Sequence, residues 1–135
     1  SWLNLWNRAL CSHLSMKISA IQIFRGAEQR VVCSIDKVKR TESIFERMRG
    51  LLGTAGLAPN SGLWINSCNS IHSFFMAFSI DVVYLDKNNM VLRIIENMPP
   101  WRCNACWSAR SVIELGQGQV NLLGIQLGDN VNCLS

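Results

Sequence analysis

The chain has 135 residues, of which 49% are hydrophobic, and a formal net charge of +4. This length supports one hydrophobic core and is too short for two ordinary ones, while the apolar content excludes a disordered chain. The positive charge is concentrated in residues 25–49, with seven Arg and Lys and four acids. This is a sparser pattern than nucleic-acid interfaces show, so we expect a solvated basic face and no nucleic-acid partner.

The first fifteen residues lack the continuous apolar core of a secretory signal, because Arg8 and His13 interrupt them. We therefore expect residues 1–15 to be an extension, non-native or disordered, and residues 16–135 to form a single domain. No transmembrane segment is expected, because no run approaches the roughly 20 apolar residues of a membrane span. These features predict a soluble, cytoplasmic protein whose six cysteines are free thiols.

The N-terminal part of the domain predicts a β-hairpin followed by the main helix. β-branched runs at Lys17–Phe24 and Arg30–Val38 are separated by a short turn, as in a hairpin. The helix is predicted over about 41–53, where Ser43 and Glu46 match a capping box.

Further strands are predicted by alternating or β-branched segments, at Gly62–Ile65, Ser79–Asp86, Met90–Asn97 and Ser111–Leu115. The segment 79–86 alternates cleanly, which places Ile80, Val82 and Tyr84 on one face and Asp81, Val83 and Leu85 on the other. Pro99 and Pro100 predict a loop from Met98 to Ala109. The remaining residues predict a helical turn, a glycine corner and a closing strand.

About seven short strands and one main helix predict a mainly β fold of the α+β class. We expect a small curled sheet or a β-barrel, with the helix at about 41–53 packed against it.

Five segments, in order and at matching spacing, carry a family resemblance: FERMRGLLG (45–53), GLWINSCNSIHSFFMAFSIDVVYLD (62–86), MPPWR (98–102), ARSVIEL (109–115) and LGIQLGDNV (123–131). Together they resemble the DUF192 family of small uncharacterised bacterial and archaeal proteins. The resemblance implies a compact β-rich domain and no particular activity. The motif positions that it carries over are Arg49, Gly50, His72, Met76, Asp81, Gly124, Gly128 and Asp129.

Cys68, His72 and Met76 are spaced by four residues and would form a set of soft metal ligands. Four residues span about 6 Å on a helix, where such side chains meet, but about 13 Å on a strand, where they do not. Because the segment is rich in aromatic and β-branched residues, we expect strand or irregular geometry and no metal shared within it.

Cys103 and Cys106 form a Cys-x-x-Cys pair, which is half of a zinc site or a redox pair. Two more ligands would be needed for zinc, and Cys68 and His72 are the candidates. The spacing does not match that of a zinc finger, so we expect buried thiols and no cofactor, and keep zinc as an alternative.

Asp81 is predicted on the same face as Val83 and Leu85, where an unpaired carboxylate would be costly, so we expect it to have a partner. His72, Arg49 and Arg102 are the candidates. In the structural interpretation Asp81 ties its strand to a helix or loop. In the functional interpretation Asp81 and His72 form an acid/base pair.

Our leading hypothesis is a non-catalytic binding or accessory module whose pocket or rim engages a small ligand or a partner protein. The candidate ligand-binding residues are Trp64, Cys68, His72, Met76, Asp81, Trp101 and Arg102. Trp64, Trp101 and Trp107 either pack together or line an aromatic pocket with His72 in its wall. For tryptophans near loops, core and rim positions are commoner than a ligand cage. One alternative is a metal-assisted or acid/base hydrolase that uses His72 and Asp81. Another is a purely structural protein whose basic face, from Arg25 to Arg49, drives assembly.

Overall fold

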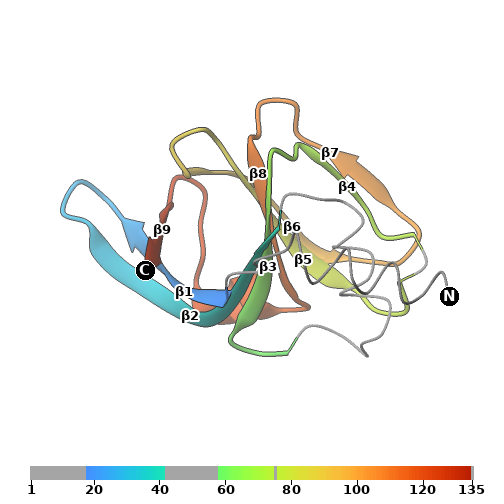
Figure 1. The fold of residues 1–135 in the computed structure, drawn as a ribbon, viewed down its shortest axis with the longest axis horizontal. Helices are drawn as coiled ribbons and strands as arrows, with labels where there is room; N and C mark the ends of the chain where they lie inside the picture. The colour runs from blue at the N-terminus through green and yellow to red at the C-terminus, as the bar shows by residue number, and fades with distance from the viewer. Residues whose placement is uncertain (1–17, 42–57, 75, 135) are drawn as a thin grey trace, which may run out of the picture.

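The computed structural model describes residues 18–41, 58–74 and 76–134. Seven strands form one strongly curled sheet in the order β6-β5-β8-β3-β2-β1-β9, and β4 and β7 form a second, two-stranded sheet (Figure 1). The elements are β1 Ile18–Arg25, β2 Arg30–Thr41, β3 Ser61–Asn66, β4 Ser70–His72, β5 Ile80–Leu85, β6 Val91–Met98, β7 Cys103–Ala105, β8 Ser111–Gly116, α3 Gln119–Leu123 and β9 Asn130–Leu134.

The strands predicted from alternation are confirmed, and so is the hairpin of β1 and β2. Within the seven-stranded sheet, β2 and β3 pair in parallel and the other neighbours pair antiparallel. The helix expected at about 41–53 lies outside the described residues, apart from Thr41, at which β2 ends. The extension expected at residues 1–15 also lies outside them. In the part of the chain that is described, no helix is long and apolar enough to cross a membrane.

The curl of the sheet brings its two edge strands together at one point. An isolated bridge joins Met90, just before β6, to Asn130 at the start of β9. The Val91 amide donates to the Asp129 carbonyl at 2.8 Å, and the Val131 amide donates to the Asn89 carbonyl at 2.9 Å. Because β6 and β9 are not paired along their length, the sheet is curled and open, and no closed barrel forms.

The corner before β9 is fastened to β1 by an ion pair. Asp129 is 1% exposed, and its two carboxylate oxygens accept from Arg25 Nε at 2.8 Å and from an Arg25 terminal nitrogen at 2.9 Å. This hydrogen-bonded pair raises the pKa of Arg25 above its ordinary value. Gly128 adopts φ 86°, a left-handed conformation that glycine permits. Gly128 and Asp129 therefore have a structural role at this corner.

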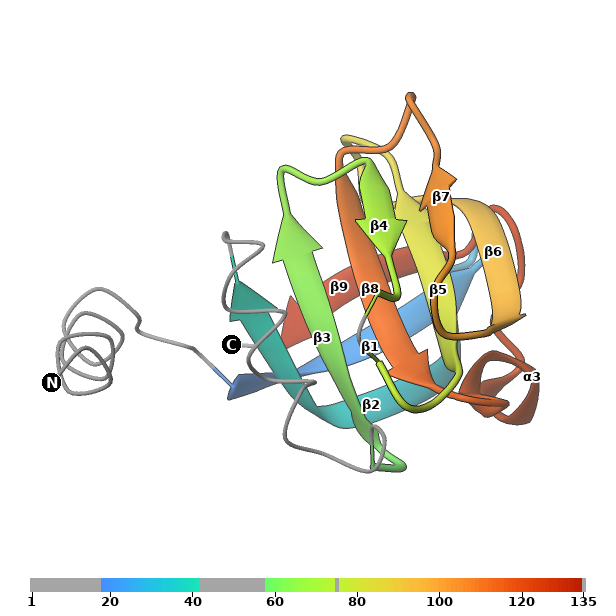
Figure 2. The same ribbon diagram turned by 90° about the vertical axis from the view of Figure 1, so that its right-hand side faces the viewer.

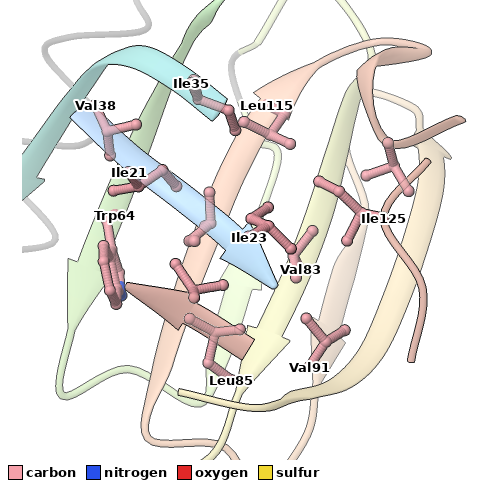
Figure 3. Close-up of a cluster of buried hydrophobic side chains, with 13 residues drawn as sticks. Ile21, Ile23, Ile35, Val38, Trp64, Val83, Leu85, Val91, Leu115 and Ile125 are labelled. Atoms are coloured by element: carbon pink, nitrogen blue, oxygen red, sulfur yellow. The ribbon is translucent and has the colours of Figure 1, made fainter. Parts of the chain in front are cut away.

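Two hydrophobic cores lie on the two faces of the sheet, and strand alternation divides the side chains between them. The first core fills the inside of the curl and includes Ile21, Ile23, Trp64, Val83, Leu85 and Leu115 (Figure 3). The second core lies on the opposite face and includes Leu63, Ile65, Ile80, Val82, Tyr84 and Val112. The predicted division of β5 into two faces is thus confirmed.

The small sheet of β4 and β7 covers the second core. Figure 2 shows β4 and β7 as a layer in front of β8 and β5. Ile71, from the middle of β4, is 3% exposed and belongs to the second core. The prediction of a continuous loop from Met98 to Ala109 was wrong, because Cys103–Ala105 pairs with β4 as β7. Cross-strand hydrogen bonding outweighs the local effect of the two preceding prolines.

Candidate functional site

Asp81 is fully buried and is held by the backbone. Its Oδ1 accepts from the Asn97 amide and its Oδ2 from the Val120 amide, each at 2.9 Å. Asp81 therefore has partners, as expected, but these two donors are backbone amides and not the side chains of His72, Arg49 or Arg102. The two bonds tie β5 to β6 and to the first turn of α3. This geometry matches the structural interpretation of Asp81.

His72 lies in a different layer from Asp81. Asp81 shares its face of β5 with Val83 and Leu85, which belong to the first core, whereas β4 lies over the second core. The His72 ring stacks on Phe74 with a centroid distance of 4.8 Å. The structure does not bring His72 and Asp81 together, so the acid/base pair considered for a hydrolase lacks the required contact.

The tryptophans expected to share a pocket are also separated. Trp64 is 1% exposed inside the first core, while Trp101 and Trp107 are 56% and 80% exposed. Trp101 stacks on Phe74 at 5.9 Å and so extends the ring stack that begins at His72. The three tryptophans thus form no common aromatic pocket, and His72, Phe74 and Trp101 form an aromatic stack on the outer layer.

Arg102 and Met76 have separate positions around this layer. Arg102 is exposed, and its backbone amide donates to Ser73 Oγ at 2.9 Å. Met76 is 7% exposed in the second core, where it serves as packing. Neither side chain joins Asp81 in a common site.

The candidate metal ligands do not assemble into a cluster. The Cys68 thiol is buried and donates to the Ser70 carbonyl at 3.0 Å, while Cys103 is exposed and pairs in register with His72. Cys106 is half-buried at the edge of the second core. Among the described residues, no three His, Cys, Asp or Glu side chains are placed to hold a metal ion. This arrangement gives the zinc hypothesis no support.

A pocket of about 510 Å³ opens where three connections meet at one end of the sheet. Its walls come from the β3–β4 connection, the β5–β6 hairpin and the residues before β8; the lining residues are Ser67, Cys68, Asn69, Lys87, Ala109 and Arg110. Backbone hydrogen bonds hold these walls, since the Cys68 amide donates to the Arg110 carbonyl at 3.1 Å and the Arg110 amide to the Leu85 carbonyl at 2.8 Å. The pocket is thus built on the ends of β3, β5 and β8.

The pocket is basic. Lys87 and Arg110 are both exposed, and no carboxylate is among its lining residues. The acid beside Lys87, Asp86, uses its Oδ1 to accept from the Asn88 and Met90 amides at 2.8 and 3.0 Å. Positive charge in a concave surface whose walls contain no carboxylate attracts anions.

Sequence reasoning missed this pocket except for Cys68. Lys87 belongs to a hairpin turn and Arg110 to a loop, and isolated cations at such positions are ordinary surface residues. No local motif links two positions so far apart in the chain. Only the pairing of β5 with β8, which aligns Leu85 with Ser111, reveals that their neighbours line one pocket.

Comparison with known sequences identifies relatives over most of the domain. The family model DUF192, described as Uncharacterized ACR, matches residues 25–133. A UPF0127 protein of Thermococcus sibiricus is 33% identical over 107 residues, covering 71% of this chain and 65% of the relative. A UPF0127 protein of Pyrococcus abyssi is 36% identical over 67 residues, covering 49% and 56%. The chain thus spans less than two thirds of the length of these curated relatives.

Two solved structures share the fold. One, from Sinorhizobium meliloti and described as a proposed transcription regulator, has a TM-score of 0.75 and 19% identity, covering 90% of this chain and 98% of the other. The second, a protein of unknown function from Novosphingobium aromaticivorans, has a TM-score of 0.72 and 17% identity, covering 90% and 89%. At such low identity these similarities establish the fold alone.

Proposed function

The chain belongs to the DUF192 family, whose description assigns no activity, and from this premise we propose that it is a non-catalytic module that binds a small anionic ligand in its basic pocket. The observation that carries the proposal is that Lys87 and Arg110 line one pocket without a carboxylate among its walls. The ligand class follows from this charge.

The chemistry of the two cations suits a carboxylate or phosphate group. A guanidinium presents a planar fork that accepts two oxygens, and an ammonium adds a compact point charge. Asn69 adds an amide and Ser67 a hydroxyl to the same walls. The volume of about 510 Å³ lies within the range of pockets for small molecules.

The positions of the reactive side chains favour binding over catalysis. His72 and Asp81 lie in different layers, so neither supplies the other with a proton. Cys68, the one thiol in the pocket wall, donates a hydrogen bond to the Ser70 carbonyl. The alternative of an acid/base or metal-assisted hydrolase has no comparable observation in its favour.

The proposal is tested by calorimetric titration with inorganic phosphate and with citrate. We expect saturable binding of at least one anion and a loss of at least about tenfold in affinity, roughly 1.4 kcal/mol, in the double variant Lys87→Gln/Arg110→Gln. The matched control is Arg30→Gln/Lys37→Gln, which removes the same charge from exposed positions on β2 and should retain the wild-type affinity. If neither anion binds saturably, or if both double variants weaken binding equally, the pocket is not the anion site.

A further inference from the structure

Within the residues that the structure describes, three buried hydrogen-bond donors on the inner face of the sheet have no acceptor. They are Arg40 Nε, Trp64 Nε1 and Ser111 Oγ. Trp64 is 1% exposed and Ser111 is 6% exposed. Buried N–H and O–H groups are nearly always paired, because an unpaired one has lost its hydrogen bonds to water without replacement. Three such donors in one region therefore call for an acceptor.

The strand register places the three donors in one patch. Arg40 on β2 is aligned with Trp64 on β3, and Asn66, two residues further along β3, is aligned with Ser111 on β8. Trp64 belongs to the first core, so residues at two-residue spacing from it share the inner face. Aligned residues have Cβ atoms about 5 Å apart and diagonal neighbours about 7–8 Å. The three donor residues therefore lie on three neighbouring strands, β2, β3 and β8, of one face.

Arg40 is fixed in place by two contacts. Its guanidinium carbon lies 4.1 Å from the centre of the Trp64 ring, and one terminal nitrogen donates to Asn66 Oδ1 at 2.8 Å. Figure 3 shows the Trp64 ring among the side chains of the first core. The stack and the hydrogen bond orient Arg40 and leave its Nε unbonded. The donor set is thus preorganised, which lowers the entropic cost of binding.

Arg40 also carries a charge that no acid balances in the described part of the chain. Its hydrogen bond is to a neutral amide, and the ion pair found among the described residues joins Arg25 to Asp129. A ligand at this place would have to accept three hydrogen bonds and balance the charge of one guanidinium. It should therefore carry a single negative charge. A carboxylate meets this requirement, because its two oxygens offer about four acceptor positions and no donor.

We infer that the inner face at Arg40, Trp64 and Ser111 is a second binding site, which takes a small carboxylate. The site is separate from the basic pocket, because Ser111 shares its face of β8 with Leu115 of the first core, whereas Cys68 and Ala109 in the pocket wall belong to the second core. This inference does not depend on the proposed function of that pocket.

The inference is tested by following the Trp64 indole N–H in ¹⁵N-labelled full-length chain during titration with acetate. The resonance is assigned by its loss in Trp64→Phe, which keeps the aromatic ring. We expect a saturable shift of this indole resonance, with the exposed Trp107 indole as the internal control. Ser111→Ala and Arg40→Gln should weaken acetate binding at least about tenfold, while Ser34→Ala, on an exposed face of β2, should leave it unchanged.

Other results would overturn the inference. A tighter response to inorganic phosphate would replace the carboxylate by a phosphate, and an equal response to chloride would leave only general ion binding. A water cross-peak to the indole N–H with no anion response would identify an ordered water as the acceptor.

Ser111→Ala without acetate should unfold at the same or a higher temperature, since it removes an unpaired hydroxyl; a lower temperature would mean that the hydroxyl is already paired. Lys87→Gln/Arg110→Gln should leave the acetate response intact, which distinguishes the two sites.

Discussion

Asp81 illustrates a buried acid whose role is to complete the backbone hydrogen bonding of its neighbours. The pairing of β5 with β6 is irregular between Ile80 and Val82, and Asn97 adopts a positive φ of 56°. At α3, the N-terminal capping residue is Gly118, which makes no side-chain cap. The amides of Asn97 and Val120 would lack partners without the Asp81 carboxylate. One acid thus supplies the hydrogen bonds that the local sequence does not.

We expect Asp81→Asn to reduce the free energy of unfolding by about 1.5–3 kcal/mol. The substitution retains the shape but replaces one accepting oxygen by an NH₂ group, which faces a backbone donor and loses a charged hydrogen bond. Urea denaturation followed by circular dichroism measures the change. Glu96→Gln, an exposed position on β6, is the control and should alter stability by less than about 0.5 kcal/mol. An equally small effect of Asp81→Asn would show that the carboxylate is dispensable.

At the scale of elements, β3 and β8 approach so closely that their contact depends on a missing side chain. A Cβ at Gly62 would lie 2.8 Å from Leu115 Cδ2 and 3.2 Å from the Glu114 carbonyl oxygen. The Leu115 methyl group can move, but Glu114 belongs to β8, whose backbone is held by pairing with β3 and β5. The glycine is therefore required by the register of two central strands.

We expect Gly62→Ala to destabilise the chain by about 1–3 kcal/mol through overpacking. This loss of stability contrasts with the usual result, because alanine in place of a glycine within a strand ordinarily raises the free energy of unfolding by about 0.5–1 kcal/mol. Leu115→Val removes the Cδ2 atom that makes the nearer of the two contacts. The double variant should therefore lose less stability than the sum of the single losses, as a double-mutant cycle in urea would measure. Additive losses, or a stabilising Gly62→Ala, would mean that the strands adjust freely.

The sequence was sufficient for the long strands but not for the outer layer. The alternation from Ile80 to Leu85 identifies both faces of β5 because six residues give three per face. β4 and β7 have three residues each, which is too short for a periodic pattern, and each exists because it pairs with the other. The separation of His72 from Asp81 was therefore not predictable, since it depends on the pairing of β4 with β7 over the second core.

The candidate sites escaped sequence reasoning for a related reason. Trp64 was predicted at a pocket or rim with Trp101, but the alternation of side chains along β3 places Trp64 inside the curl. Arg40 and Ser111 had no local signal, because they meet Trp64 only through the parallel register of β2 with β3 and the antiparallel register of β3 with β8. Such contacts between distant segments are set by topology and not by local periodicity.

At the scale of the whole molecule, the two cores share their supporting strands. β3 contributes Trp64 to the first core and Ile65 to the second, and β5 contributes Val83 to the first and Val82 to the second. A strand that loses its packing on one face therefore loses its alignment on the other. This coupling predicts that the described part of the chain folds as a single cooperative domain, despite having two separate hydrophobic clusters.

A matched pair of variants tests this cooperativity. Ile21 in β1 belongs to the first core and Ile80 in β5 to the second, and both are 0% exposed. We expect Ile21→Ala and Ile80→Ala each to cost about 2–5 kcal/mol, because the same atoms are removed from well-packed surroundings. Urea unfolding should be followed by NMR at amides of β1, which report on the first core, and of β4, which report on the second. If the cores are coupled, each variant lowers the midpoint at both sets of amides equally, although Ile21 lies on a strand that contributes nothing to the second core. If Ile21→Ala shifts only the β1 amides and Ile80→Ala only the β4 amides, the two faces of the sheet unfold independently and the single-domain prediction is wrong.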